Sequence, residues 1–342
     1  MAFLSRYTVV LAAAVMLWPA APSPAQDKAA PNLSAPLRLT LPIRCVPGRD
    51  CWLVNLVDLE PGPGVLDYAC GKRSYDGHKG VDIAIRDLGA MKNGVDVVAS
   101  AGGVVRGTRD GMADINITTT GRASIKGREC GDGLVVSHGG GWETQYCHMR
   151  QGSVAVKKGD TIVRGQRLGL VGHSGFAQFP HLHLSVRRNK QIVGPFAGLG
   201  RRGGCGPGPA PLWTDKALAA LSIEGTALFN AGFAGGPLKP SIARSGRMAE
   251  PGLSRRAAAL VLWVDIYWPK VGDEIGFRLT APGGRLLLEK NVRVKKTQAR
   301  RFIYVGKKRK TSLWPAGVYR GEIVLLRQGA KLTTARRQVD LH

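Results

Sequence analysis

The chain has 342 residues, of which 44% are hydrophobic, and this composition is typical of a globular protein that buries its own core. Its 49 Lys and Arg outnumber its 24 Asp and Glu, which gives a formal charge of +25. The composition excludes a disordered or fibrous chain, and the charge favours anionic partners such as cell-wall polymer or lipid headgroups.

Residues 1–25 have the pattern of a secretory signal peptide. Arg6 precedes an apolar run from Tyr7 to Trp18, and small residues lead to an expected cleavage site after Ala25. The run is too short to span a bilayer, and no Cys follows it to carry a lipid. We therefore expect an exported protein without a transmembrane segment, for which nucleic acid is not a partner.

The six cysteines form an even set, for which disulfide bonds are the default interpretation in an exported chain. None belongs to a CxxC pair, so a thiolate zinc site is not expected. Cys130 and Cys147 flank a predicted hairpin around residues 139–141 and are the first predicted pair. Cys45 with Cys51, closing a small loop, is the second. Spacing alone does not decide the full connectivity.

Residues 26–60, rich in Pro, are predicted to be an extended, disulfide-pinned lead-in without catalytic residues. From residue 61 to 200 the pattern changes to short apolar segments separated by glycines, which predicts an antiparallel β-sheet or barrel-like domain. The expected strands are 81–85, 95–99, 104–107, 115–118, 134–137, 143–148, 161–163, 168–171 and 182–186.

The segment from Val156 to Gly169 resembles the hairpin of lipoyl- and biotinyl-carrier domains. A carrier needs a Lys displayed at a tight hairpin tip, and no Lys of this chain has that setting. The carrier interpretation therefore accounts for a local fold but not for the histidines described below.

Residues 201–255 are predicted to be a Gly- and Pro-rich linker held by Cys205, with a short helix at 215–221. Beyond it, residues 256–342 are predicted to form a second all-β unit, most like a small immunoglobulin-type sandwich. Between Asn291 and Arg337 this unit has fourteen Lys or Arg and one acidic residue, Glu322. Two interpretations of these basic residues stay open. They form either a solvated surface or a face that binds an anionic envelope polymer, in which case the chemistry is left to the first domain. The strands expected here are 258–266, 274–279, 285–288, 301–305, 317–325 and 333–339.

Two histidines, His181 and His183, lie in an apolar alternating run with one residue between them, so they project from the same face of a strand. Two imidazoles on one strand make half of a metal site. A catalytic zinc ion takes three protein ligands and leaves a fourth position open, and His78 and Asp82 offer the missing donors. The helix-based HExxH motif is absent from the sequence.

Three separated motifs in this order resemble the lysostaphin/LytM-type zinc metallopeptidases, a family of peptidoglycan endopeptidases. The resemblance covers about a third of the chain, residues 77–187. Its motifs are Gly77-His78-Lys79-Gly80-Val81-Asp82, Thr144-Gln145-Tyr146-Cys147-His148-Met149, and Gly172-His173-Ser174-Gly175 followed by His181-Leu182-His183-Leu184.

The resemblance implies that His78, Asp82 and His183 bind one Zn²⁺ per chain and that His148 and His181 are the catalytic pair. Strand alternation predicts that His148 shares a face with Tyr146 and leaves Cys147 on the other side. Of the remaining histidines, His138 is interpreted as structural, His173 as a loop residue near the site and His342 as a terminal residue.

The chain departs from the family pattern in three places. Ser185 stands where a Glu is common, on the same strand face as the two strand histidines, which puts the outer support of the metal ligands in doubt. The loop 177–180 lacks the usual Thr-Gly-Pro, so the wall of the substrate groove should differ. His173 is also unusual within its motif, where it would crowd or assist the site.

The family implies hydrolysis of peptide cross-links in peptidoglycan. An exported, disulfide-bonded chain fits the periplasm best, with the extracellular space as the alternative, and there the usual target is the D-alanyl bond to diaminopimelate. Two other functions stay open: a catalytically silent activator of wall amidases, and a wall-binding structural protein that works through its basic β-sandwich.

Overall fold

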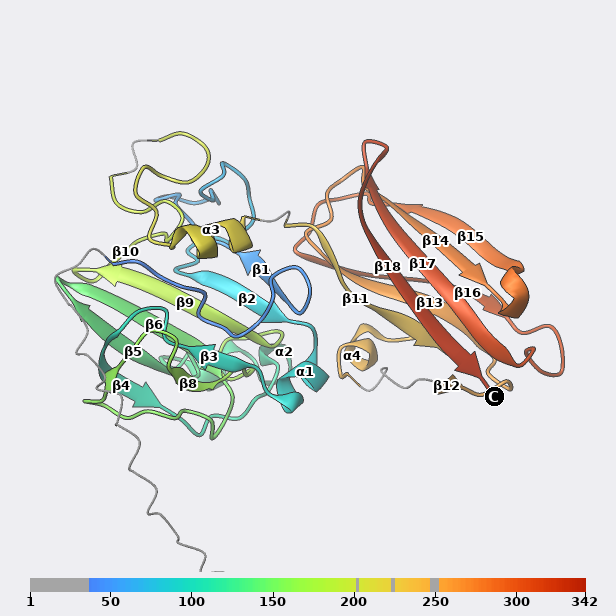
Figure 1. The fold of residues 1–342 in the computed structure, drawn as a ribbon, viewed down its shortest axis with the longest axis horizontal. Coiled ribbons are helices and arrows are strands. Elements are labelled where there is room, and N and C mark those ends of the chain that lie inside the picture. Colours follow the sequence, from blue (N-terminus) through green and yellow to red (C-terminus); the bar gives the residue numbers. More distant parts are fainter. Residues whose placement is uncertain (1–36, 201–202, 223–224, 247–251) are drawn as a thin grey trace, which may run out of the picture. The chain divides into compact units, whose positions relative to one another are not determined.

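The computed structural model describes residues 37–200, 203–222, 225–246 and 252–342, so the predicted signal peptide lies outside the described residues. The described residues belong to one compact unit, Pro31–His342. Their secondary structure is mainly β, with antiparallel sheets, which confirms the predicted fold class (Figure 1). No helix in these described ranges is long and apolar enough to cross a membrane.

The largest sheet has eight strands in the order β1-β2-β9-β6-β5-β4-β7, with β10 paired to β9, and all its pairings are antiparallel (Figure 1). A two-stranded ribbon, β3-β8, accompanies it. The strands β2, β9 and β6 are neighbours near the middle of the sheet and carry the motifs described above. The bounds are β1 Cys51–Asn55, β2 Val81–Ile85, β3 Asp96–Val98, β4 Gly103–Arg109, β5 Asp132–Gly139, β6 Trp142–Met149, β7 Thr161–Ile162, β8 Arg167–Leu170, β9 His181–Arg188 and β10 Gln191–Ile192.

Helices are few and short in the described residues. Helix α3 (Asp215–Leu221) forms at the predicted residues and is capped by Thr214, whose side chain accepts from the backbone N–H of Ala217. The strand expected at 115–118 is wrong: the Asn116 side chain accepts from the backbone N–H of Thr118 and caps helix α2. The other bounds are α1 Leu88–Asn93, α2 Ile117–Thr120, α4 Pro240–Ala243 and the 3₁₀ turns η1 Arg122–Ile125 and η3 Pro282–Gly284.

The structure describes the predicted lead-in, residues 26–60, from residue 37 onwards. This segment contributes a strand and buried side chains to the first domain. The predicted Cys45–Cys51 disulfide is present, and β1, which follows it, pairs with β2 at the edge of the main sheet. Leu39 and Ile43 are buried and form bridges to Trp213 and to β3. The segment therefore completes both the sheet and its core.

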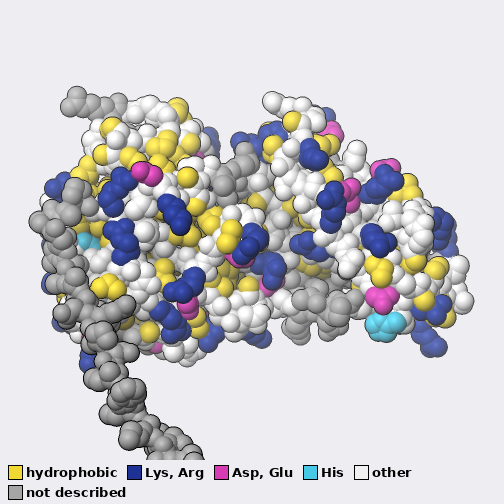
Figure 2. Space-filling model, in the orientation of Figure 1, with side chains coloured by type: hydrophobic (Ala, Val, Ile, Leu, Met, Phe, Trp, Pro, Cys, Tyr) yellow, Lys and Arg dark blue, Asp and Glu magenta, His cyan; other side chains and the backbone are white. Residues whose placement is uncertain are grey.

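The charge excess lies on the surface. Figure 2 shows one face of the molecule, with many Lys and Arg side chains and far fewer Asp and Glu side chains.

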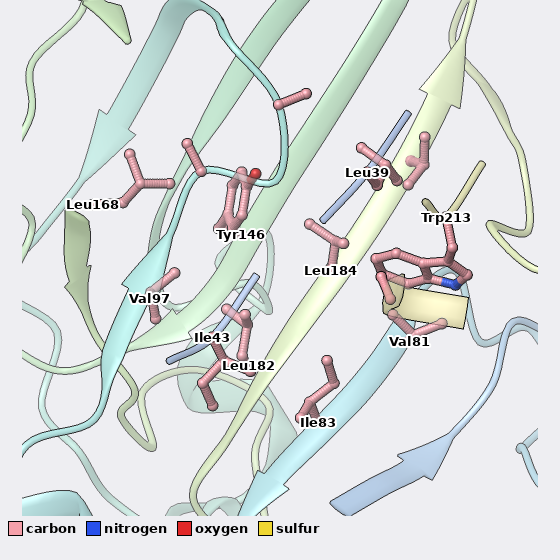
Figure 3. Packing of buried hydrophobic residues seen from close by; sticks show 14 of the residues in the cluster. Leu39, Ile43, Val81, Ile83, Val97, Tyr146, Leu168, Leu182, Leu184 and Trp213 are labelled. Carbon is pink, nitrogen blue, oxygen red and sulfur yellow. The ribbon is translucent and has the colours of Figure 1, made fainter. Parts of the chain in front are cut away.

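The core of the main sheet lies on the face opposite the paired histidines. Alternate residues of β2 and β9 point into this core, and buried side chains from outside the sheet cover them (Figure 3). Each such side chain contributes about 1.5–3 kcal/mol when it is fully buried, so the orientation of β9 is strongly determined. The labelled members are Leu39, Ile43, Val81, Ile83, Val97, Tyr146, Leu168, Leu182, Leu184 and Trp213.

The C-terminal strands form two further sheets around a second hydrophobic core (Figure 1). One sheet has the order β11-β13-β16 and the other β12-β18-β17-β14-β15. The first strand, β11, lies inside the predicted linker 201–255, which thus contains part of this sheet as well as α3. The immunoglobulin-type assignment stays a prediction. The bounds are β11 Ala227–Ala234, β12 Gly252–Leu253, β13 Ala259–Tyr267, β14 Glu274–Thr280, β15 Leu286–Arg293, β16 Arg300–Lys308, β17 Gly317–Arg327 and β18 Ala330–Leu341.

The other two disulfides join Cys130 to Cys147, as predicted, and Cys70 to Cys205. The second of these spans 135 residues and ties the start of the predicted linker to the region before β2. Crosslinks of this kind stabilise a protein mainly by restricting its unfolded chain.

Candidate metal centre

Three candidate ligand atoms lie together on one face of the main sheet. The Nε2 atom of His78 is 3.2 Å from Oδ1 of Asp82 and 3.1 Å from Nδ1 of His183. The Asp82 Oδ1 and His183 Nδ1 atoms are 2.8 Å apart. Strand pairing produces this arrangement, because Asp82 of β2 lies directly opposite His183 of β9. The structure thus brings together the three residues expected to bind the metal.

The two histidines of this cluster are each oriented by a further hydrogen bond from the second ring nitrogen. His78 donates from Nδ1 to the backbone oxygen of Leu56 at 2.7 Å, and His183 Nε2 lies 2.9 Å from the Ser185 hydroxyl. Such outer partners fix which ring nitrogen faces a metal. The serine that departs from the family pattern therefore contacts the ligand that it was expected to leave unsupported.

Asn55 was missed by sequence reasoning. Its Nδ2 atom donates to Oδ2 of Asp82 at 2.7 Å, so one carboxylate oxygen is held and the other is directed toward the two imidazoles. The residue lies in the lead-in that was predicted to have no catalytic residues. The apolar run from Trp52 to Val54 could have revealed it, because such a run indicates a buried strand. A polar side chain at the end of a buried strand needs a hydrogen-bond partner.

The donor set fits a zinc ion. Two imidazole nitrogens and one carboxylate oxygen are typical zinc ligands, and ligand bonds of about 2.0–2.2 Å at tetrahedral angles would place donor atoms about 3.3 Å apart. The observed separations of 2.8–3.2 Å are close to that value. Gly80 leaves room for the cluster, because a Cβ atom at this position would lie 2.5 Å from Nε2 of His183.

The electrostatics of the cluster favour a cation. Burial by itself would raise the pKa of the Asp82 carboxyl, but His78 and His181 together with hydrogen bonds hold this pKa well below its usual range. Burial lowers the pKa of His78, and the neighbouring Asp82 outweighs that effect and raises it. A buried carboxylate that stays ionised needs positive charge beside it, which a bound cation would supply.

Two further imidazoles lie beside the three ligand atoms. The rings of His148 and His181 are 4.6 Å apart between centroids, and His148 is 5.8 Å from His183. Nδ1 of His148 lies 2.8 Å from the backbone oxygen of Ser174, and Nδ1 of His181 lies 2.8 Å from that of Phe179. A carbonyl only accepts, so in both neutral rings the proton is on Nδ1 and the lone pair is on Nε2.

Burial keeps both of these rings neutral. It lowers the pKa of His181, and it lowers that of His148 well below the ordinary value, where the two neighbouring histidines add to the effect. Nε2 of His181 lies 3.6 Å from Oδ1 of Asp82, which places this ring at the edge of the three candidate ligands. Both rings therefore keep a free Nε2 lone pair at neutral pH, which can accept a hydrogen bond from water.

The backbone of His148 corrects the prediction that it shares a face with Tyr146. Tyr146 lies opposite Leu184 and Cys147 opposite His183, so strict alternation would send the His148 ring into the core. Instead His148 has a left-handed backbone, with φ of 60°, and its ring reaches the histidine face. Its N–H donates to the backbone oxygen of Cys130 at 2.8 Å, next to the disulfide, which helps to hold this uncommon conformation.

The remaining histidines are outside the cluster. His138 lies 2.7 Å from the Gly102 oxygen and 2.8 Å from the Thr144 hydroxyl through its two ring nitrogens. His173 is buried, and its backbone N–H donates to Oδ1 of Asp114 at 2.6 Å. Burial, with His181 nearby, lowers the pKa of the His173 imidazole to about 4. Its Nε2 atom has no hydrogen-bond partner among the described residues.

Comparison with known proteins agrees with this geometry. The sequence pattern of peptidase family M23 matches residues 76–195. The protein named DD-carboxypeptidase/endopeptidase Mpg of Neisseria gonorrhoeae is 36% identical over 107 residues, which are 31% of this chain and 22% of that relative. The protein named peptidoglycan DD-endopeptidase ShyA of Vibrio cholerae serotype O1 is 34% identical over 109 residues, 32% of this chain and 20% of the relative.

The chain thus spans about a fifth of the length of the curated relatives it matches. Among solved structures, the catalytic domain of the antimicrobial peptidase lysostaphin from Staphylococcus simulans is 20% identical, with 42% of this chain and 86% of that chain covered and a TM-score of 0.27. All five candidate site residues lie inside the matched segment. Residues 76–195 of this chain therefore form a peptidase family M23 domain.

Proposed function

We propose that this protein is a zinc-dependent endopeptidase that hydrolyses peptide cross-links of peptidoglycan. The observation that carries the proposal is the convergence of three typical zinc donors with two neutral imidazoles on one face of a sheet. Peptidoglycan as the substrate is supported by the names of the relatives, which include a peptidoglycan DD-endopeptidase. These names also favour the D-alanyl cross-link over a glycyl bridge.

In this proposal, His78, Asp82 and His183 hold the zinc ion. When bound, the ion supplies a Lewis acid that polarises the scissile carbonyl and makes water more acidic. His148 and His181 then move the protons. The Nε2 lone pair of one ring accepts a proton from the attacking water, and a protonated ring stabilises the oxyanion and returns a proton to the leaving amine as the C–N bond breaks.

We place the protein in the periplasm, where peptidoglycan is accessible to an exported protein of this kind. The signal peptide expected at residues 1–25 supports export, and the peptidoglycan-acting relatives support an envelope location. The disulfides are consistent with an oxidising compartment.

We also propose that the C-terminal strands bind an anionic envelope polymer. Three exposed arginines, Arg278, Arg320 and Arg336, here called the arginine face, line an open groove over β14, β17 and β18. Strand register places Arg278 and Arg336 on either side of Glu322, which offsets part of their charge. A row of planar guanidinium groups suits carboxylate or phosphate groups repeated along a polymer.

Digestion of purified sacculi tests the proposed activity. We expect the mature protein to release muropeptides with cleaved cross-links, a zinc chelator to abolish the release, and added zinc to restore it. Release that required an added amidase would indicate an amidase activator. Sedimentation with sacculi without any release would indicate a wall-binding structural protein, and either result would refute the endopeptidase assignment.

A further inference from the structure

A cluster of aromatic rings joins the C-terminal strands to the main sheet. Phe229 of β11 and Tyr267 of β13 stack with 3.8 Å between ring centroids, and both pack against Trp52 of β1. Next to them, Nε1 of Trp268 donates to the backbone oxygen of Val54 at 2.6 Å. Phe229 and Tyr267 are almost fully buried, so these contacts hold the C-terminal strands against the sheet that carries the site.

Arg300, the first residue of β16, is the charged member of this cluster. Its guanidinium carbon lies 4.7 Å from the ring centroid of Phe229 and 5.5 Å from those of Tyr267 and Phe179. It also donates from Nε and from a terminal nitrogen to Asp265 Oδ2, at 3.1 and 2.8 Å. The Asp265 side chain is 1% exposed and that of Arg300 is 14% exposed, so the cation is fixed among the rings by a buried carboxylate.

Phe179 connects this cluster to the candidate active site. Its ring lies 6.1 Å from that of Tyr267 and 4.8 Å from that of His181, between centroids. Its backbone oxygen accepts the hydrogen bond from Nδ1 of His181 at 2.8 Å. Phe179 therefore determines both the orientation of the His181 ring and the nitrogen that carries the proton, and Phe179 itself is held by Arg300 and Tyr267.

We infer that Arg300 is a positioning residue for His181, acting through Phe179, so that the C-terminal strands complete the active site. The inference rests on the proposed function, in which His181 transfers protons. It replaces the expectation that the C-terminal unit leaves the chemistry to the first domain. A chain cut near Arg256 would lose both Tyr267 and Arg300 and expose the rings that they cover.

The kinetic test uses Arg300→Met, which keeps an unbranched side chain but removes the charge. We expect kcat on soluble cross-linked muropeptides to fall by about 10-fold or more, because small misplacements of a catalytic group reduce rates by up to about 100-fold. KM and bound zinc should change little. Arg301→Met is the matched control, since the next residue on the strand points to the opposite face.

A double-variant cycle separates positioning from general support. Phe179→Leu keeps the backbone oxygen but removes the ring, and in this background Arg300→Met should have little further effect on kcat. Additive losses, equal losses in Arg300→Met and Arg301→Met, or loss of zinc in Arg300→Met would overturn the inference. If Arg300→Met does not fold, Arg300→Lys takes its place. An unchanged kcat in both Arg300→Lys and Phe179→Leu would also overturn the inference.

Nitrogen-15 NMR of the His181 imidazole gives a readout that does not depend on hydrolysis. The wild-type protein should show the proton on Nδ1, and Arg300→Met should shift the ring toward a mixture of tautomers. An unchanged tautomer in Arg300→Met would contradict the inference. If the wild-type protein proves inactive on muropeptides, the proposed function fails, and this NMR comparison alone decides whether Arg300 positions His181.

Discussion

Asn55→Ala should weaken zinc binding without changing any of the three candidate ligands. The substitution removes the 2.7 Å hydrogen bond to Asp82 Oδ2, and water cannot replace it easily, because Asn55 is 8% exposed and Asp82 is 2% exposed. Loss of such an outer partner typically costs about 10–100-fold in metal affinity. That range equals about 1.4–2.7 kcal/mol, which agrees with the cost of about 1–3 kcal/mol for a buried acceptor left unpaired.

The zinc dissociation constant can be measured by competition with a chromophoric chelator at fixed pH. Asn230→Ala is a matched control. Asn230 is 7% exposed and donates at 3.1 Å to Asp87, which is not one of the three candidate metal ligands. Thermal unfolding of the metal-free proteins should show comparable losses of stability in the two variants. Equal zinc affinity in Asn55→Ala and the wild-type protein, or the same loss of affinity in Asn230→Ala, would refute the reasoning.

Two further predictions concern the proposed roles of the site and of the arginine face. Alanine at any of the three candidate ligands, for example His183→Ala, should remove both zinc and activity, whereas His148→Ala and His181→Ala should keep zinc, measured by atomic absorption, and lose about 10²–10⁴-fold in rate. Zinc loss in either of the latter variants would make that residue a ligand. Replacing the arginine face by Gln should reduce sedimentation with sacculi at 0.1 M salt but not at 1 M, because the Debye length falls from about 10 Å to about 3 Å. The same sedimentation as the wild-type protein across the salt series would leave these arginines as a solvated surface.

Sequence alone determined the features that depend on neighbouring residues. The alternation around His181 and His183 predicted that both point to one face of a strand, and β9 confirms the strand. The positions of two cysteines on either side of an expected hairpin predicted the Cys130–Cys147 disulfide, and α3 forms at residues 215–221, where a short helix was expected. These features follow from local sterics and from the period of the side chains, which a short stretch of the chain already contains.

Tertiary structure alone decided which distant groups support the site. Asn55 reaches Asp82 because β1 pairs with β2, and Arg300 reaches Phe179 only because two parts of the chain pack through the same rings. His148 leaves the alternating pattern because the Cys130 backbone and disulfide hold it in a left-handed conformation. Each of these outcomes depends on contacts between residues far apart in the chain, whose energies no local pattern of side chains encodes.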